Sequence, residues 1–172
     1  MATFNLKEEI LKGHSKAQCD KIVRWVGNSQ LRFDELFYLF LHDGDKITQR
    51  SSWPVSYCVQ AHPELIQLHF ASLIKNLQKK NLHDAIKRNS MRLLQFVNIP
   101  KKYQGSIMDY CFTYLQSPTE PVATKVFSIY VLVNLSKIYP DILPEIKLVI
   151  EEQLPHQTAG FKSAAKKVMK LK

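Results

Sequence analysis

The sequence predicts an all-α protein built from repeated pairs of helices, and three observations support this. Apolar residues recur at the helical period along most of the 172 residues, and no segment alternates with period two for long enough to form a strand. Prolines lie between these amphipathic segments or at their starts, where a missing N–H is tolerated. Basic residues return at equivalent places every 37 or 38 positions. These features predict helix pairs in series.

Ten helices are expected, separated by short loops that bring consecutive helices into antiparallel contact. The expected ranges are 4–12, 15–27, 30–42, 45–61, 63–79, 83–97, 102–116, 121–139, 143–154 and 159–171. Gly27 to Ser29 and His42 to Asp45 give the clearest breaks. Pro54 falls inside 45–61, so this helix is expected to kink, or to split near Trp53.

Four segments of the chain align with one another without gaps. They begin at Arg50, Arg88, Lys125 and Lys162. The turn residues that precede them are Asp45, Asp84, Glu120 and Thr158. Before each turn lies another amphipathic helix, so the repeating unit is a helix pair. One such pair cannot bury its apolar face alone, and the pairs are therefore expected to stack as an α-solenoid.

With this pattern, residues 15–172 resemble the HEAT-repeat family. The resemblance implies a right-handed α–α superhelix of about four HEAT-like helix pairs, in a single domain over residues 1–172 with a helical N-terminal cap at about 1–28. It also implies a ladder of turn acids and bases between neighbouring repeats, and second helices that line the concave side. Two units depart from the pattern: the last lacks the turn acid, and Lys16 to Asn28 align only loosely, at a spacing of 34.

The net charge of +9 is unevenly distributed along the chain. Residues 1–74 contain eight basic and eight acidic residues, whereas residues 75–102 contain eight basic residues and one acidic residue. Residues 103–172 contain eight basic and six acidic residues, and their last helix is rich in lysine. Such patches attract polyanions, or they are simply solvated surface. Few aromatic residues are interleaved in 75–102, which weakens a case for base stacking.

The leading functional prediction is a non-catalytic scaffold that binds a protein partner through the second helices. The residues assigned to binding are Arg50, Trp53, Lys87, Arg88, Arg92, Lys125, Lys162 and Lys166. The alternative is a nucleic-acid-binding module, or a binder of another polyanion, that uses the basic segment 75–102. A HEAT-like alkylpurine DNA glycosylase is a remote version of that alternative, although no tryptophan–aspartate pair with a matching motif is present. The repeated basic residues also have a structural interpretation, in which they pair with the turn acids of the ladder between repeats.

No catalytic residue, cofactor or metal site is predicted. No two of the six histidines are spaced i,i+3 or i,i+4 on a helix, and the nucleophile and phosphate-loop motifs are absent. The three cysteines lie far apart in apolar helical patterns, which favours reduced core thiols in a cytoplasmic protein. The start of the chain does not read as a secretory signal, and the longest apolar run, 126–135, is too short to span a membrane.

Overall fold

The computed structural model describes residues 4–171, and the secondary structure within that range is helical throughout. The prediction of an all-α chain is confirmed for these residues. The chain forms two compact units, residues 1–97 and residues 98–172, which are described separately below as unit 1 and unit 2. Across the described range, no helix is both long enough and apolar enough to cross a membrane.

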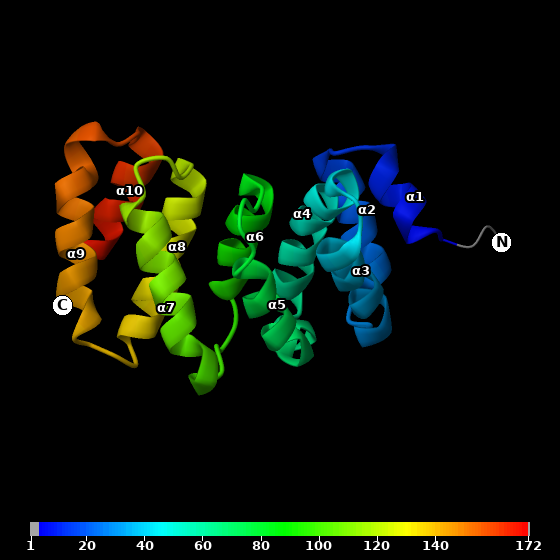
Figure 1. Ribbon diagram of the computed structural model, residues 1–172, viewed down its shortest axis with the longest axis horizontal. Coiled ribbons are helices and arrows are strands. Elements are labelled where there is room, and N and C mark those ends of the chain that lie inside the picture. The colour runs from blue at the N-terminus through cyan, green and yellow to red at the C-terminus, as the bar shows by residue number, and fades with distance from the viewer. Residues whose placement is uncertain (1–3, 172) are drawn as a thin grey trace. The chain divides into compact units, whose positions relative to one another are not determined.

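Unit 1 is organised around its longest helix, α4. Its elements are α1 (Leu6–Lys12), α2 (Lys16–Val26), α3 (Gln30–His42), α4 (Asp45–Ala61), the 3-10 helix η1 (Pro63–His69), α5 (Phe70–Leu77) and α6 (Asp84–Leu94) (Figure 1). Helix α4 contacts α1, α2, α3, η1 and α6. The core of the unit contains four fully buried phenylalanines, Phe33, Phe37, Phe40 and Phe70. Burial of this apolar surface is the main force that holds the short helices together.

The helix boundaries in unit 1 follow local capping chemistry. The hydroxyls of Ser15 and Ser29 accept hydrogen bonds from backbone N–H groups in the first turns of α2 and α3. Gly27 ends α2 with a φ of +53°, a region that glycine adopts without steric cost. Gly27 and Ser29 belong to the break that the sequence predicted, and both helices lie within the expected ranges.

Two expectations about proline-containing segments need correction. Helix α4 continues through Pro54 as one helix, so the predicted split near Trp53 is wrong. Pro54 is buried in the middle of α4, where the packing of α4 against five neighbouring elements offsets the lost backbone hydrogen bond. The single helix expected over 63–79 is instead η1 followed by α5, because His69 has a backbone conformation of φ −108° and ψ 1° that interrupts the α-helix. Asp34 fixes His69 there through a contact of 2.6 Å between carboxylate oxygen and Nε2.

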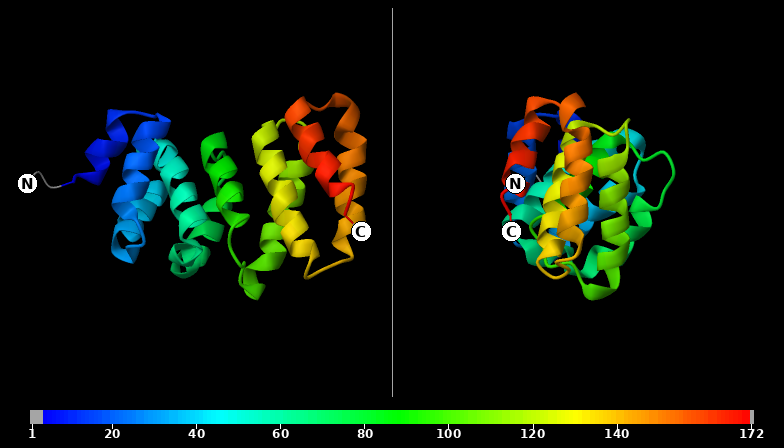
Figure 2. Two further views of the ribbon diagram at one scale, coloured as in Figure 1. Left: turned by 180° about the vertical axis from the view of Figure 1, so that it is seen from behind. Right: turned by 90° about the vertical axis from the view of Figure 1, so that its left-hand side faces the viewer.

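Unit 2 is organised around α8. Its elements are α7 (Lys101–Gln116), α8 (Val122–Ser136), α9 (Ile142–Gln153), the short 3-10 helix η2 (Leu154–His156) and α10 (Ala159–Val168). Helix α8 contacts α7, α9 and α10, as the two views in Figure 2 allow the reader to follow. It is apolar on almost all sides because neighbours cover most of its circumference, and Ile129, Val131 and Leu132 are fully buried. The interpretation of this segment as a core helix is confirmed.

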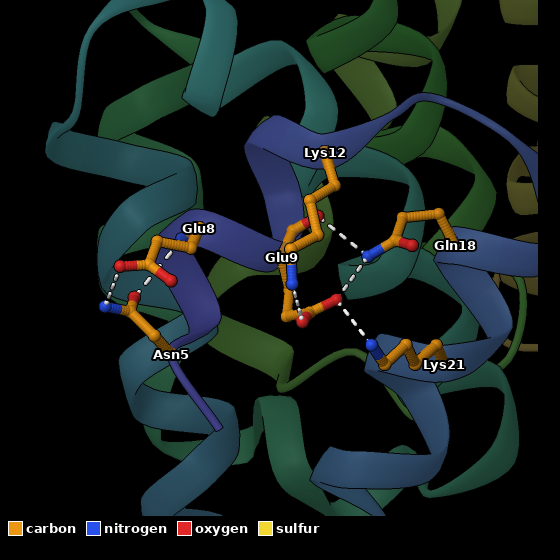
Figure 3. Close-up of polar contacts among 6 residues, drawn as sticks. All are labelled: Asn5, Glu8, Glu9, Lys12, Gln18 and Lys21. Atoms are coloured by element: carbon orange, nitrogen blue, oxygen red, sulfur yellow. Dashed lines mark hydrogen bonds and ion pairs between the residues drawn. The ribbon is translucent and has the colours of Figure 1, made fainter. Parts of the chain in front are cut away.

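Helix α1 is fastened to the rest of unit 1 by a buried carboxylate. Glu9 is 6% exposed, and its two oxygens accept hydrogen bonds from Lys12 Nζ at 2.5 Å, Lys21 Nζ at 2.8 Å and Gln18 Nε2 at 2.9 Å (Figure 3). Gln18 Nε2 also donates to the backbone carbonyl of Glu9 at 2.7 Å. Because Lys21 and Gln18 belong to α2, this cluster joins α1 to α2. The hydrogen bonds from Lys12, Lys21 and Gln18 lower the pKa of Glu9 from 4.5 to about 2.

The Glu9 cluster predicts a specific dependence of stability on pH. A carboxyl group whose pKa is lower in the folded state stabilises the fold above its unfolded pKa, and this stabilisation disappears as the pH falls from about 4.5 towards 2. Thermal unfolding of wild type and Glu9→Gln between pH 7 and pH 2 is expected to show a stability difference that narrows across this window. Glu8→Gln, an exposed neighbour, is the control. A difference that stays constant with pH would contradict the prediction.

Candidate binding surface

Helices α2, α4 and α6 of unit 1 lie next to one another, and α4 contacts both of the others. Trp53 and Tyr57 are spaced i,i+4 on α4 and therefore emerge from the same face, one turn apart. Both side chains are half-buried, and their rings meet edge to face with centres 6.2 Å apart. The middle helix of this layer thus presents two large aromatic rings that are accessible at the surface.

Tyr57 receives a cation from each neighbouring helix. The guanidinium of Arg92, on α6, lies 4.2 Å from the centre of the tyrosine ring, and Lys16 Nζ, on α2, lies 4.8 Å from it. Both distances fall within the range of favourable cation–π attraction. We call Lys16, Trp53, Tyr57 and Arg92 the Tyr57 cluster. It joins three successive helices of the layer at one point.

Polar neighbours hold the cations of the Tyr57 cluster in place. Arg92 Nη2 donates to Gln60 Oε1 at 3.3 Å, one turn beyond Tyr57 on α4. Lys16 forms an ion pair with Asp20, one turn further along α2, and this hydrogen bond raises the pKa of Lys16. His14 packs against Trp53 with ring centres 5.4 Å apart. Lys16 therefore stays charged at neutral pH, and its carboxylate partner lies beside the cluster.

Arg50 lies one turn before Trp53 on α4, but its guanidinium has a structural role. It donates to the backbone carbonyl of Leu11 at 2.8 Å and approaches that of Ile10 at 3.5 Å. These carbonyls belong to the last turn of α1 and have no partner within that helix. Since α1 packs against α4, the arginine caps α1 and ties it to the layer.

Two further basic residues of α6 differ in their surroundings. Lys87 forms an ion pair of 3.3 Å with Asp84, the first residue of the helix. Arg88 is half-buried, and within residues 4–171 its guanidinium forms no hydrogen bond or ion pair. It lies one turn before Arg92, so it adds positive charge next to the Tyr57 cluster.

A comparison with protein-family models matches residues 6–172 to a family described as HEAT repeat domain. The chain belongs to this family. Comparisons with curated proteins and with solved structures found no match. The family accounts for the succession of helix pairs in both units, and it makes the protein a helical repeat scaffold.

The repeated basic residues have different environments although they occupy equivalent positions in successive repeats. They are Arg50 on α4, Arg88 on α6, Lys125 on α8 and Lys162 on α10. Lys125 is only 3% exposed, and its Nζ donates to Gln153 Oε1 on α9 at 2.8 Å. Burial lowers the pKa of Lys125, and the negative charge of Glu120 opposes this effect. Lys125 is therefore a buried structural group of unit 2.

Among the described residues, the contacts of the turn acids and of the repeated basic residues differ from the predicted ladder between neighbouring repeats. The pairing expected for the first repeat is replaced by the contact between Arg50 and α1, and Asp84 pairs with Lys87 instead of Arg88. Glu120 and Lys125 attract each other electrostatically, but both belong to the same repeat, whereas the ladder was expected to join neighbouring repeats. The difference arises because one turn of helix offers alternative partners, such as Lys87, at equal reach.

The basic segment 75–102 does not form one surface within unit 1. Lys101 and Lys102 belong to unit 2. Lys79 Nζ donates to the carbonyl of Leu41 at 3.3 Å and lines a hollow that shares no residue with the Tyr57 cluster. The charge of the segment is thus divided among several places. Lys162 and Lys166 are exposed on α10 of unit 2.

Tyr57, the central residue of the cluster, is not among the residues that the sequence predicted for binding. Its i,i+4 spacing from Trp53 was the available signal, because this spacing places both rings on one face of a helix. Lys16 and Asp20 were missed as well, since the first unit aligns poorly with the repeat. Within the described residues, no group of three or more histidine, cysteine or acidic side chains is arranged to hold a metal ion.

Proposed function

We propose that this HEAT repeat domain is a non-catalytic scaffold that binds a protein partner through the α2–α4–α6 layer of unit 1. The observation that supports the proposal is the Tyr57 cluster. Tryptophan, tyrosine and arginine dominate the energetic centres of protein interfaces. The two aromatic residues contribute large contact areas with little loss of side-chain entropy, and arginine adds a planar, charged hydrogen-bond donor. Here all three lie together, and the aromatic rings are half-buried before any partner binds.

The charges near the cluster favour a partner with acidic groups. Lys16 is neutralised by Asp20, whereas Arg88 and Arg92 add positive charge on the α6 side. An acidic side chain of a partner would gain a charge-assisted hydrogen bond at Arg88 while an apolar group covers Trp53. The mixture of aromatic, cationic and acidic side chains resembles a protein interface more than a surface for phosphates.

A nucleic-acid-binding module is the second candidate, because bases stack on accessible aromatic rings and Trp53 and Tyr57 supply two of them beside a basic helix. Several of the basic residues that the sequence offers for phosphate binding instead contact groups of their own unit. These are Arg50, Lys79, Lys87 and Lys125. This reduces the number of cations available for phosphates and ranks this candidate second. The remote glycosylase version needs a carboxylate beside the rings, and the one nearby, Asp20, is paired with Lys16.

Removing the ring of Tyr57 or the guanidinium of Arg92 is expected to weaken capture of the protein partner at least tenfold. The full chain would be immobilised, exposed to a nuclease-treated lysate at moderate salt and compared with Tyr57→Ala and Arg92→Ala. Tyr38→Ala and Arg24→Ala replace exposed residues of the same types on α3 and α2, outside the Tyr57 cluster, and are the matched controls. A protein partner lost with the first two variants and kept with the controls is the expected result.

The same variants separate the two candidates. Binding of labelled single-stranded and duplex oligonucleotides would be measured over a range of salt concentrations. Saturable binding with a steep salt dependence, lost when Lys87, Arg88 and Arg92 are reversed in charge together, would replace the protein-scaffold proposal with the nucleic-acid one. Equal capture by wild type and Tyr57→Ala would contradict the assignment of the surface.

We also infer a reducing compartment such as the cytoplasm, and the cysteines support this. Cys19, Cys58 and Cys111 are all buried thiols, and none of the three forms a disulfide. Burial raises the pKa of Cys19 and of Cys58 to about 12, so neither thiol is activated at neutral pH. The three behave as small apolar core residues.

A further inference from the structure

Asn76, near the end of α5, has a buried amide with no hydrogen-bond acceptor for its nitrogen. The side chain is 4% exposed, and Nδ2 contacts no acceptor in unit 1. A buried donor without a partner destabilises the folded state, and nearly all such groups in proteins are satisfied. An apolar residue of the same size would avoid this penalty. The presence of asparagine here therefore calls for an acceptor that comes from outside the chain.

Asn76 lines a polar cleft where α3 and α5 end and α4 and α6 begin. The cleft has a volume of about 380 Å³, and its lining also includes Asp45, Lys79, Lys80 and His83. This volume is within the range that holds a small metabolite. A smaller hollow of about 170 Å³ borders it, and Leu41, Asn76 and Lys79 line both. The hydrogen bond of 3.3 Å from Lys79 Nζ to the Leu41 carbonyl therefore lies at the boundary between the two spaces.

The groups around the cleft are mostly hydrogen-bond donors. Within residues 4–171 the ammonium of Lys80 forms no ion pair or hydrogen bond, and that of Lys79 donates only to a neutral carbonyl. His83 Nδ1 accepts the backbone N–H of Ala85 at 3.1 Å, so the proton of the neutral ring is on Nε2. Of the two acids in the lining, Asp43 is paired with Lys7 at 2.9 Å, which leaves Asp45 as the acceptor. Several donors and one free carboxylate suit an anionic ligand that also carries a hydroxyl or amine.

We propose that this cleft binds a small polar molecule through a phosphate or carboxylate group. The oxyanion accepts hydrogen bonds from Asn76 Nδ2 and from the ammonium groups of Lys79 and Lys80, while Asp45 accepts one from a hydroxyl or amine of the same molecule. Lys79 exchanges the neutral Leu41 carbonyl for a charged acceptor, which is the stronger hydrogen bond. This movement opens the boundary between the two hollows above Asn76. The site shares no residue with the Tyr57 cluster, so the proposal is independent of the scaffold function.

Asn76→Leu separates a binding role from a structural one. Leucine has the same branched side-chain skeleton as asparagine and removes the unsatisfied donor, so the variant is expected to melt a few degrees above wild type. The same change is expected to weaken anion binding at least tenfold. A gain in stability together with a loss of binding is typical of a binding residue, because binding sites retain groups that the fold alone would not favour. A lower melting temperature for Asn76→Leu would show that the amide supports the fold, and would overturn the proposal.

The binding test uses the full chain and two probes, inorganic phosphate and succinate, titrated at constant ionic strength with sodium chloride as the reference salt. Side-chain amide and backbone NMR signals of Asn76 and of residues 79–86 are expected to shift saturably with one probe or both, and this also shows whether phosphate or carboxylate is preferred. Lys80→Ala should weaken the response at least fivefold. Lys46→Ala, which removes an exposed lysine of α4 outside the cleft, should not. No saturable shift with either probe, or an unchanged response in Asn76→Leu, would overturn the proposal.

Discussion

Phe37→Ala is expected to lower the free energy of unfolding of unit 1 by about 3–5 kcal/mol. Phe37 is 1% exposed, and its ring packs against those of Phe33, Phe40 and His69 with centres 5.7, 5.5 and 4.6 Å away. Truncation to alanine removes the buried ring and leaves a cavity between α3 and the start of the next repeat. Because domains of this size are stable by only about 5–15 kcal/mol, the variant should be close to unfolding at physiological temperature.

The neighbouring residue provides the control for this prediction. Tyr38 is 62% exposed on the same helix, so Tyr38→Ala should change stability by less than about 1 kcal/mol. Urea unfolding followed by tryptophan fluorescence reports on unit 1 specifically, since Trp25 and Trp53 both lie there. Similar midpoints for the two alanine variants would show that the phenylalanine cluster is not the core of the unit.

The sequence predicted helices well because their signals are local. Gly27 and Ser29 act on backbone groups within one turn, so the end of α2 and the start of α3 could be predicted without knowledge of the fold. The interruption at His69 was not readable in this way. It depends on Asp34, 35 residues earlier, and on the phenylalanine rings of α3, which become neighbours only after the helices pack.

The candidate surface was predicted less well for the same physical reason. Alignment of repeats identifies equivalent positions on successive helices, but the contact between Tyr57 and Arg92 joins positions that are not equivalent in that alignment. Arg50 was assigned to binding because no sequence signal shows that the end of α1 lies against α4. Packing between helices therefore decided which basic residues contact the fold and which remain at the surface.

Gln153→Leu is expected to destabilise unit 2 by about 2–3 kcal/mol. Gln153 Oε1 accepts the ammonium of Lys125 at 2.8 Å, and its Nε2 donates to the carbonyl of Leu115 at 2.8 Å, so one side chain joins α9 to α8 and α7. Leucine leaves the ammonium of the buried Lys125 without that acceptor, and it leaves the Leu115 carbonyl without its donor. Removing one partner of a buried charge is more costly than removing both.

That asymmetry gives the decisive measurement. Lys125→Met combined with Gln153→Leu should be more stable than Gln153→Leu alone, because the methionine removes the uncompensated charge while keeping the side-chain volume. Unfolding would be followed by circular dichroism, with hydrogen exchange of peptides from α7 to α9 to localise the effect. The exposed Gln116→Leu is the matched control.

Burial lowers the pKa of Lys125 in the folded state, so the folded state binds fewer protons than the unfolded chain just below pH 10.5. Wild-type stability should therefore gain from this residue as the pH rises through that window, and the gain should vanish with Lys125→Met. A double variant no more stable than Gln153→Leu would show that the lysine charge is not what the glutamine stabilises.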